Sequence, residues 1–179
     1  DGTPDNKITT DDRVIRGNDQ PDLNYFANLS FNYKKWSFEV LFQGVTGVDA
    51  YYSAPFSNGL NLTGDGLTPM KAQLDYWTPE NPGARYPRPT PSPDYDNNHH
   101  ASDYWHFDAS YCRVKYIQVG YTFDQMSLKK VGISSIRVYL NAQNPFTFAK
   151  ESMIDPENRG QMGSYPLVKT YSVGLSLNF

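Results

Sequence analysis

The chain has 179 residues and a formal net charge of −3, which gives no support for a nucleic-acid partner. Aromatic side chains make up 15% of it and are accompanied by 13 Gly and 13 Pro, a composition that fits a β-protein with long loops better than a helical one. No stretch approaches the ~18 apolar residues of a membrane helix, so any crossing of a membrane must use β-strands. Cys112 is the only cysteine, which excludes an internal disulfide and disfavours a metal site built from thiolates.

The first twelve residues, DGTPDNKITTDD, have the spacing of a calcium-binding loop. The oxygen ligands would come from Asp1, Thr3, Asp5, Lys7 through its backbone carbonyl, Thr9 directly or through water, and Asp12. Asn6 stands where such loops have Gly, a mild departure because Asn tolerates a left-handed backbone. Asp12 stands where Glu is usual and reaches less well, which should lower the affinity. An acidic, solvated loop is the alternative, so Ca²⁺ is a candidate ligand and not a required cofactor.

Five segments alternate apolar and polar side chains with the period of two that indicates a β-strand with two different faces. They are residues 23–33, 36–45, 111–123, 135–144 and 170–179. Lipid on one side and water on the other would produce this pattern, although a half-buried strand of a soluble sandwich shows it too. The polar faces carry Glu39, Gln43, Arg137, Asn141 and Gln143, which we expect to face a lumen.

Short and long connections alternate between these segments. Lys34–Lys35 is a tight turn, residues 47–108 form a long loop, and residues 124–134 are a shorter link that contains the helical-turn sequence SLKKVG. Bacterial outer-membrane barrels have short periplasmic turns and long extracellular loops. The last strand would therefore run inward and end in the periplasm at Phe179, and residues 1–22 would belong to an extracellular loop.

Five strands cannot close a membrane barrel, which needs at least about eight. An open sheet would leave two unpaired edges in lipid, at several kcal/mol for each unsatisfied backbone group. We therefore expect further barrel strands from an amino-terminal part. The opening residues agree, because they read like a loop from the middle of a protein and contain no signal peptide.

Several stretches, in this order, resemble the carboxy-terminal end of the SusC/RagA-type TonB-dependent transporters of the Bacteroidetes outer membrane. They are LNYFANLSFNYKKWSFEVLFQGVTG (23–47), DYWTPENPGARYPR (75–88), DASYCRVKYIQVGYTF (108–123), GISSIRVYLNAQNPFTFAK (132–150) and YPLVKTYSVGLSLNF (165–179). Each stretch is a weak signal alone, but together they cover nearly all of the chain.

The resemblance implies an all-β transmembrane antiparallel barrel of 22 strands with a plugged lumen, of which this chain would supply the last five. It also implies an importer of oligosaccharides, or of peptides in some members, in the bacterial outer membrane. A SusD-like surface lipoprotein would close over the barrel. The TonB complex would act through the amino-terminal part, where the plug also lies. Tyr171 and Phe179 would form the assembly signal of the last strand.

Aromatic residues and Pro are abundant in the loop 47–108, and exposed aromatic faces can stack on sugars or pack against a partner protein. If this loop contacts substrate or lid, residues 75–88 are the best candidates. The contact set would be Tyr76, Trp77, Arg85, Tyr86, Arg88, Tyr104 and Trp105. The alternative is that these side chains pack the loop against itself.

Two further groups of polar residues lie in or near the third strand. His99, His100 and His106 accompany several aspartates, but solvated histidines are the preferred interpretation because a zinc site needs rigidly held ligands. Arg113 and Lys115 share the parity of the apolar residues from Ile117 to Phe123 and should emerge at the outer edge of the apolar band. There they would contact lipopolysaccharide phosphates or simply extend into water.

The sequence contains no G-x-S-x-G nucleophile motif, Gly-rich phosphate loop or CxxC pair, and it predicts a protein that is not an enzyme. Two alternatives to the importer remain. One is a soluble β-sandwich that binds carbohydrate through its aromatic loop, and the other is a purely structural outer-membrane barrel.

Overall fold

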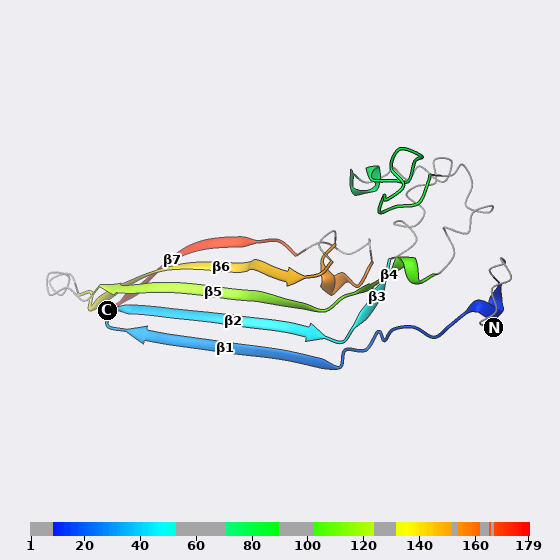
Figure 1. Ribbon diagram of the computed structural model, residues 1–179. Helices are drawn as coiled ribbons and strands as arrows, with labels where there is room; N and C mark the ends of the chain where they lie inside the picture. Colours follow the sequence, from blue (N-terminus) through cyan, green and yellow to red (C-terminus); the bar gives the residue numbers. More distant parts are fainter. Residues whose placement is uncertain are drawn as a thin grey trace.

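The computed structural model describes residues 9–52, 71–89, 102–123, 132–151, 154–161, 165 and 167–179. Its main element is a five-stranded antiparallel sheet in the order β1-β2-β5-β6-β7 (Figure 1). The strands are β1 (Leu23–Tyr33), β2 (Trp36–Thr46), β5 (Tyr111–Phe123), β6 (Ser135–Ala149) and β7 (Thr170–Asn178). The prediction of an all-β antiparallel fold is confirmed.

The helical elements of the described residues are short 3₁₀ turns. They are η1 (Thr10–Asp12), η2 (Lys71–Leu74), η5 (Asp103–Trp105) and η7 (Pro156–Asn158). None of the helices found in the described ranges is long and apolar enough to span a membrane.

The two ends of the sheet differ in how the strands are joined (Figure 1). At the turn end, the two-residue turn Lys34–Lys35 joins β1 to β2 beside the closing pair Tyr33 and Trp36, and Phe179 follows β7. At the other end, which we call the loop end, lie the connections from β2 to β5 and from β6 to β7. The fold therefore contains the alternation of short and long connections that the sequence indicates.

The apolar side chains of the strands gather on one face of the sheet, because residues that pair directly across strands point to the same side. One such row crosses all five strands as Leu29, Val40, Ile117, Ala142 and Tyr171. The neighbouring row points to the opposite, polar face and consists of Ser30, Glu39, Gln118, Asn141 and Ser172. The polar face is not wholly polar, since Phe26 and Leu41 also lie on it.

The apolar face is largely uncovered within this chain. Leu29, Leu140 and Val173 are 58%, 59% and 75% exposed. The accessible surface of the chain is 12647 Å², whereas a compact monomer of 20.4 kDa would expose about 8,800 Å². Hydrophobic side chains left in this state need another apolar phase or another protein to cover them.

A β-bulge in β5 reverses the faces of the residues that precede it. The pairing with β2 changes from Leu41–Tyr116 to Phe42–Val114, which leaves Lys115 as the extra residue. Arg113 therefore pairs with Gln43 on the polar face and is 1% exposed. The prediction that Arg113 faces outward is wrong, because one inserted residue exchanges the two faces of a strand. Its burial excludes contact with lipopolysaccharide, and Lys115 turns to the carboxylate of Glu157 instead.

The same irregularity lets β6 extend past a proline. The sequence predicts that this strand ends at Asn144, but β6 continues to Ala149. Asn144 and Pro145 lie opposite Lys115 in the pairing of β5 with β6, and Asn144 has φ 49°. A proline is tolerated in a strand at such a bulge, because the ladder hydrogen bonds are already interrupted there.

The predicted loop 47–108 contains a short ribbon that the alternation did not reveal. β3 (Asp49–Tyr51) pairs with β4 (His106–Asp108) and extends the β2–β5 pair beyond the loop end of the sheet. Two small hydrophobic cores lie here, one around Val48 and Ala109 and the other around Trp105. The described buried residues thus gather mainly at and beyond the loop end of the sheet.

Candidate functional site

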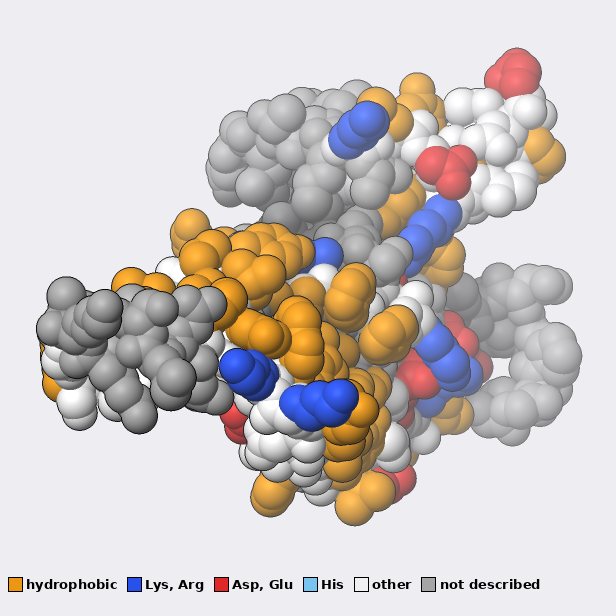
Figure 2. Space-filling model, turned by 90° about the vertical axis from the view of Figure 1, so that its left-hand side faces the viewer, with side chains coloured by type: hydrophobic (Ala, Val, Ile, Leu, Met, Phe, Trp, Pro, Cys, Tyr) orange, Lys and Arg blue, Asp and Glu red, His pale blue; other side chains and the backbone are white. Residues whose placement is uncertain are grey.

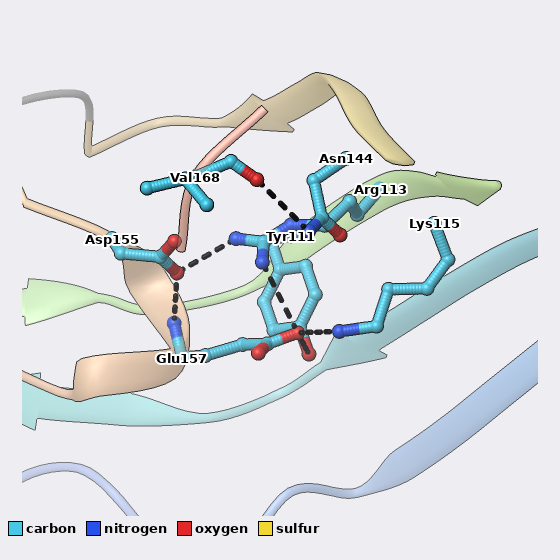
Figure 3. A network of polar contacts seen from close by, with 7 residues as sticks. All are labelled: Tyr111, Arg113, Lys115, Asn144, Asp155, Glu157 and Val168. Atoms are coloured by element: carbon cyan, nitrogen blue, oxygen red, sulfur yellow. Dashed lines mark hydrogen bonds and ion pairs between the residues drawn. The ribbon is translucent and has the colours of Figure 1, made fainter. Parts of the chain in front are cut away.

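The segment between β6 and β7 folds against the polar side of β5 at the loop end (Figure 3). Its residues 154–161, which we call the acidic turn, contain η7. Arg113 Nη2 donates to Asp155 Oδ1 at 2.7 Å, and Arg113 Nη1 lies 3.5 Å from Glu157 Oε1. The Tyr111 hydroxyl donates to the same Glu157 oxygen at 2.9 Å, and Lys115 Nζ lies 3.4 Å from it. The bulge in β5 thus aims a buried cation at two carboxylates of a distant loop.

Asp155 organises the acidic turn as well as binding Arg113. It precedes η7 as the N-cap, and its Oδ1 accepts a hydrogen bond from the backbone N–H of Glu157 at 3.0 Å. Pro156 occupies the first helical position, where its fixed φ suits the turn. The side chain of Asp155 is 12% exposed, so its charge is balanced by Arg113 rather than by water.

Glu151, just after β6, is the centre of a second buried polar group. It is 7% exposed and accepts hydrogen bonds from Arg85 Nη2 at 2.9 Å and from the Tyr52 hydroxyl. Burial and the hydrogen bond to Glu151 raise the pKa of the Tyr52 hydroxyl well above its ordinary value. This group joins the segment 71–89 to the ends of β3 and β6.

The acidic turn makes two more contacts with distant parts of the chain. Arg159 Nη1 donates to the backbone carbonyl of Asp19 at 3.0 Å. Gly160 has φ 81° and packs so closely on the backbone of Tyr51 that a side chain would collide with it. Glu151 and the acidic turn therefore tie together the amino-terminal segment, β3, β5 and the segment 71–89.

Asp75 closes the segment 75–86 on itself. Its Oδ1 accepts from Asn81 Nδ2 at 3.0 Å, and its Oδ2 accepts from the backbone N–H of Arg85 at 3.3 Å. The Tyr86 N–H donates to the Asp75 carbonyl at 3.0 Å, and the Trp77 N–H donates to the Tyr86 carbonyl at 2.8 Å. The DYWTPENPGARYPR sequence thus forms a hydrogen-bonded loop of defined shape.

The predicted contact residues of this region divide into buried and exposed sets. Tyr86 and Trp105 are 3% and 1% exposed, and their rings lie 6.5 Å apart in a small core with Tyr52. Arg85 is bound to Glu151, as described above. Tyr76, Trp77, Arg88 and Tyr104 are exposed at the surface.

Burial raises the pKa of the Tyr86 and Tyr104 hydroxyls above their ordinary value, more than the nearby Arg85 lowers it. Both hydroxyls therefore stay neutral at physiological pH. The exposed half of the predicted set can meet a ligand or a partner, whereas Tyr86 and Trp105 hold the loop in place.

The polar residues that we expect in a lumen share the polar face of the sheet. Glu39 pairs with Gln118 and accepts a hydrogen bond from Asn28 Nδ2 at 3.3 Å. Arg137 reaches across Gly120 to donate to Ser37 Oγ at 2.9 Å. Gln43, Asn141 and Gln143 lie on the same side, according to the pairing of their strands.

The metal sites considered from the sequence fall mostly outside the described residues. Asp1, Thr3, Asp5 and Lys7 of the calcium loop lie outside them, and so do His99 and His100. Asp12 Oδ2 accepts from the backbone N–H of Thr9 at 2.7 Å, and the Asp11 N–H donates to Thr9 Oγ1 at 3.3 Å. Within the described part of the chain, no group of three His, Cys, Asp or Glu residues is placed to hold a metal ion.

The residues of the acidic turn were not predicted as functional from the sequence. The sequence does contain a signal for Arg113, the partner of the acidic turn. In YCRVKYIQVGYTF, the apolar side chains change from even to odd positions between Val114 and Ile117. Such a change of parity within one strand indicates a bulge. Nothing in the sequence alone pairs Arg113 with Asp155, which lies 42 residues away.

No family model matches the chain. TonB-dependent receptor P3 of Formosa agariphila is 29% identical to it over 192 residues, which cover 97% of this chain and 18% of the relative. TonB-dependent receptor SusC of Bacteroides thetaiotaomicron is 38% identical over 84 residues, or 44% of this chain and 8% of its own length. The resemblance to SusC/RagA-type TonB-dependent transporters is confirmed. The chain spans less than a fifth of the length of these TonB-dependent relatives.

The fold agrees with that resemblance. A solved structure titled "Structure of the RagAB peptide transporter" superposes with a TM-score of 0.72 and 24% identity, over 97% of this chain and 19% of that one. The fold of the sheet therefore resembles part of that transporter chain. The relatives named above are receptors and transporters rather than enzymes.

Proposed function

We propose that this chain is the carboxy-terminal barrel segment of a TonB-dependent importer in the bacterial outer membrane. The observation that carries the proposal is the likeness to a TonB-dependent receptor over 97% of the chain, together with a sheet that has one exposed apolar face and one polar face. In this proposal the apolar face contacts lipid and the polar face lines the lumen. The five strands are the last of 22, and the unpaired edges of β1 and β7 pair with strands of the amino-terminal part.

The same proposal sets the direction of the strands. The turn end lies in the periplasm and the loop end lies at the cell surface, because outer-membrane barrels have short periplasmic and long extracellular connections. The acidic turn and the segment 75–88 are then at the extracellular mouth. A SusD-like lipoprotein closes over this mouth, and the TonB complex supplies energy from the periplasmic side.

The cargo in this proposal is an oligosaccharide or a peptide. One relative is named SusC, and one structural neighbour is titled a peptide transporter. Exposed Tyr76, Trp77 and Tyr104 offer aromatic faces for sugar stacking or for packing against the lid, and Arg88 offers a cation. The hydrogen-bonded loop 75–86 that holds Tyr76 and Trp77 suits recognition, since preorganised side chains lose little entropy on binding.

Growth and uptake of the native bacterium test the proposal. Deletion of the gene should abolish growth on one oligosaccharide or peptide source, and the full-length gene should restore it. Variants Trp77→Ala and Tyr104→Ala should lower uptake of that source, whereas Val14→Ala, an exposed apolar residue outside the predicted contact set, should not. Growth of the deletion strain on every such source would contradict the importer and favour a structural barrel.

Extraction of the full-length protein separates the membrane proposal from a soluble sandwich. We expect it in the outer-membrane fraction, where it should need detergent for solubility because an apolar face of this size aggregates in water. A monomer that is soluble without detergent would leave only the carbohydrate-binding module. Pull-down of a SusD-like lipoprotein with the tagged protein would support the proposal that such a lipoprotein closes over the barrel.

A further inference from the structure

One basic side chain at the turn end lies on the apolar side of the sheet. Lys34 Nζ lies 5.3 Å from the centre of the Tyr33 ring. Tyr33 pairs with Trp36, and Trp36 pairs with Tyr121, so these three rings form one row on the apolar face. The ammonium group thus sits at the border of the apolar face and not on the polar, lumen-facing side.

Further aromatic rings lie next to Tyr33 along the end of the apolar face. The Phe31 and Tyr33 rings are stacked with centres 6.4 Å apart, and the Trp36 and Tyr121 rings meet edge to face at 4.9 Å. Tyr33 and Trp36 are 56% and 54% exposed. Tyr and Trp concentrate where a membrane meets water, because each has an apolar ring and a polar hydrogen-bond donor. This row marks the depth at which lipid headgroups would lie.

The described β1–β2 hairpin is basic beside its turn, and its nearest acidic residue, Glu39, lies on the polar face. Residues 23–38 contain Lys34 and Lys35 and no Asp or Glu. Arg137, on the polar face nearby, is also basic. Figure 2 looks onto the turn end and shows Lys and Arg side chains directly beside hydrophobic ones. An ammonium group next to apolar rings complements a ligand that has a phosphate head and a hydrocarbon tail.

The backbone at Lys34 carries a conformational cost. Its φ is 55°, in the left-handed region, where two-residue hairpins favour Gly, Asn or Asp. The chain therefore holds a lysine where its backbone geometry favours another residue. Residues held in disfavoured conformations often have a function that compensates for the strain.

We propose that Lys34, Lys35, Tyr33 and Trp36 form a binding site for an anionic phospholipid of the leaflet that the turn end reaches. The ammonium groups contact the phosphate, and the Tyr33 hydroxyl and the Trp36 indole N–H can donate hydrogen bonds to it. The acyl chains lie along the apolar face beside Phe31. This inference rests on the proposed membrane function and adds a lipid partner at its periplasmic border.

The test uses the full-length protein in detergent micelles, with bound phosphatidylglycerol counted by native mass spectrometry during a lipid titration. Lys34→Asn removes the charge and places a residue that accepts a left-handed backbone, so the hairpin should keep its fold. Each lysine lost should weaken phosphatidylglycerol binding about fivefold, so Lys34→Asn combined with Lys35→Gln should weaken it roughly 25-fold. Lys169→Gln removes an exposed lysine at the opposite end and should change nothing.

Four results would overturn the lipid site. The double variant could bind phosphatidylglycerol as well as the unchanged protein does, or Lys169→Gln could weaken binding equally. Phosphatidylcholine could bind as tightly as phosphatidylglycerol, or inorganic phosphate could displace the lipid, which would show a site without the proposed selectivity. Heat-shifted gel migration would report that each variant retains its barrel.

The lipid-site proposal and the importer proposal are refuted by different results. Unchanged lipid binding in the double variant, with uptake intact, refutes the lipid site alone. A full-length protein that stays soluble without detergent refutes the membrane function on which the site depends.

Discussion

Replacing Arg113 by Met should release the acidic turn from β5. Arg113 is 1% exposed, and its guanidinium is paired with Asp155 at 2.7 Å and with Glu157 at 3.5 Å. Methionine keeps an unbranched apolar stem in the same space but removes the charge and every donor. The two carboxylates, 12% and 23% exposed, would then lose their buried cation.

The expected loss of stability depends on the contacts that Asp155 and Glu157 keep in Arg113→Met. Removing one partner of a buried ion pair costs about 3–5 kcal/mol. Asp155 keeps the bond from the Glu157 N–H at 3.0 Å, and Glu157 keeps Lys115 at 3.4 Å, so the lower end of that range applies. A loss of about 3 kcal/mol in the free energy of local opening corresponds to roughly 150-fold more frequent opening of the turn.

Amide hydrogen exchange of the full-length protein measures this opening. The reporters are the N–H groups of Asn158, Arg159 and Gln161, which donate within the turn at 2.9, 3.2 and 2.9 Å. Their exchange should accelerate in Arg113→Met, while the amides paired between β1 and β2 should keep their rates. Arg88→Met, which removes an exposed arginine, serves as the matched control.

A double-mutant cycle makes the test specific. Asp155→Asn in the Arg113→Met background should cost much less than in the unchanged protein, because the lost cation no longer interacts with that carboxylate. Equal exchange rates in Arg113→Met and the unchanged protein, or additive effects of the two substitutions, would refute the reasoning.

Four further outcomes can be measured. Trp105→Ala should destabilise the small core of Tyr52, Tyr86 and Trp105 by about 3–5 kcal/mol and make the segment 71–89 sensitive to limited proteolysis, whereas Trp105→Phe should cost less. Equal resistance of the Ala variant would contradict the packing role. Hydrogen bonds from Lys150 and Ser110 lower the pKa of Asp108 to about 2. This carboxylate therefore stabilises the fold above its ordinary pKa, and the stabilisation is lost as the pH falls from about 4 to 2. Carbon-13 NMR should show the pKa of Asp108 returning toward 4 in Lys150→Gln, and an unchanged pKa would refute the pairing. Phe179→Ala should reduce the amount of protein in the outer membrane, and unchanged surface levels would count against an assembly role. Calcium titration by calorimetry should show binding that Asp12→Asn weakens, and no heat of binding in the full-length protein would leave residues 1–12 as a solvated loop.

The strands were predictable because their pattern is local. A period of two needs only neighbouring residues, and it located β1 at Leu23–Tyr33 and the regular part of β5 from Tyr116 to Phe123. The prediction ended β6 at Asn144, directly before Pro145, a residue that central strands normally exclude. The structure continues that strand, since the bulge opposite Pro145 removes the need for its N–H.

The candidate site was less predictable, because its contacts join segments far apart in the chain. The sequence identified residues 75–88 as a loop of interest, but it could not separate buried Tyr86 and Trp105 from exposed Trp77 and Tyr104. It also left out Glu151, because an isolated glutamate near a strand end is normally solvated. Its burial depends on Arg85, which lies 66 residues earlier.

The sequence by itself determined that this protein is built from two-faced strands joined alternately by short and long connections, and its ordered motifs indicated the transporter family. Tertiary structure alone decided which side chains point where near the loop end, because one extra residue at Lys115 exchanges the faces of β5 before it. That exchange turns Arg113 from an expected surface cation into the buried partner of Asp155. The physical reason is that alternation is a property of neighbouring residues, whereas register and ion pairing depend on segments that meet only in the folded chain.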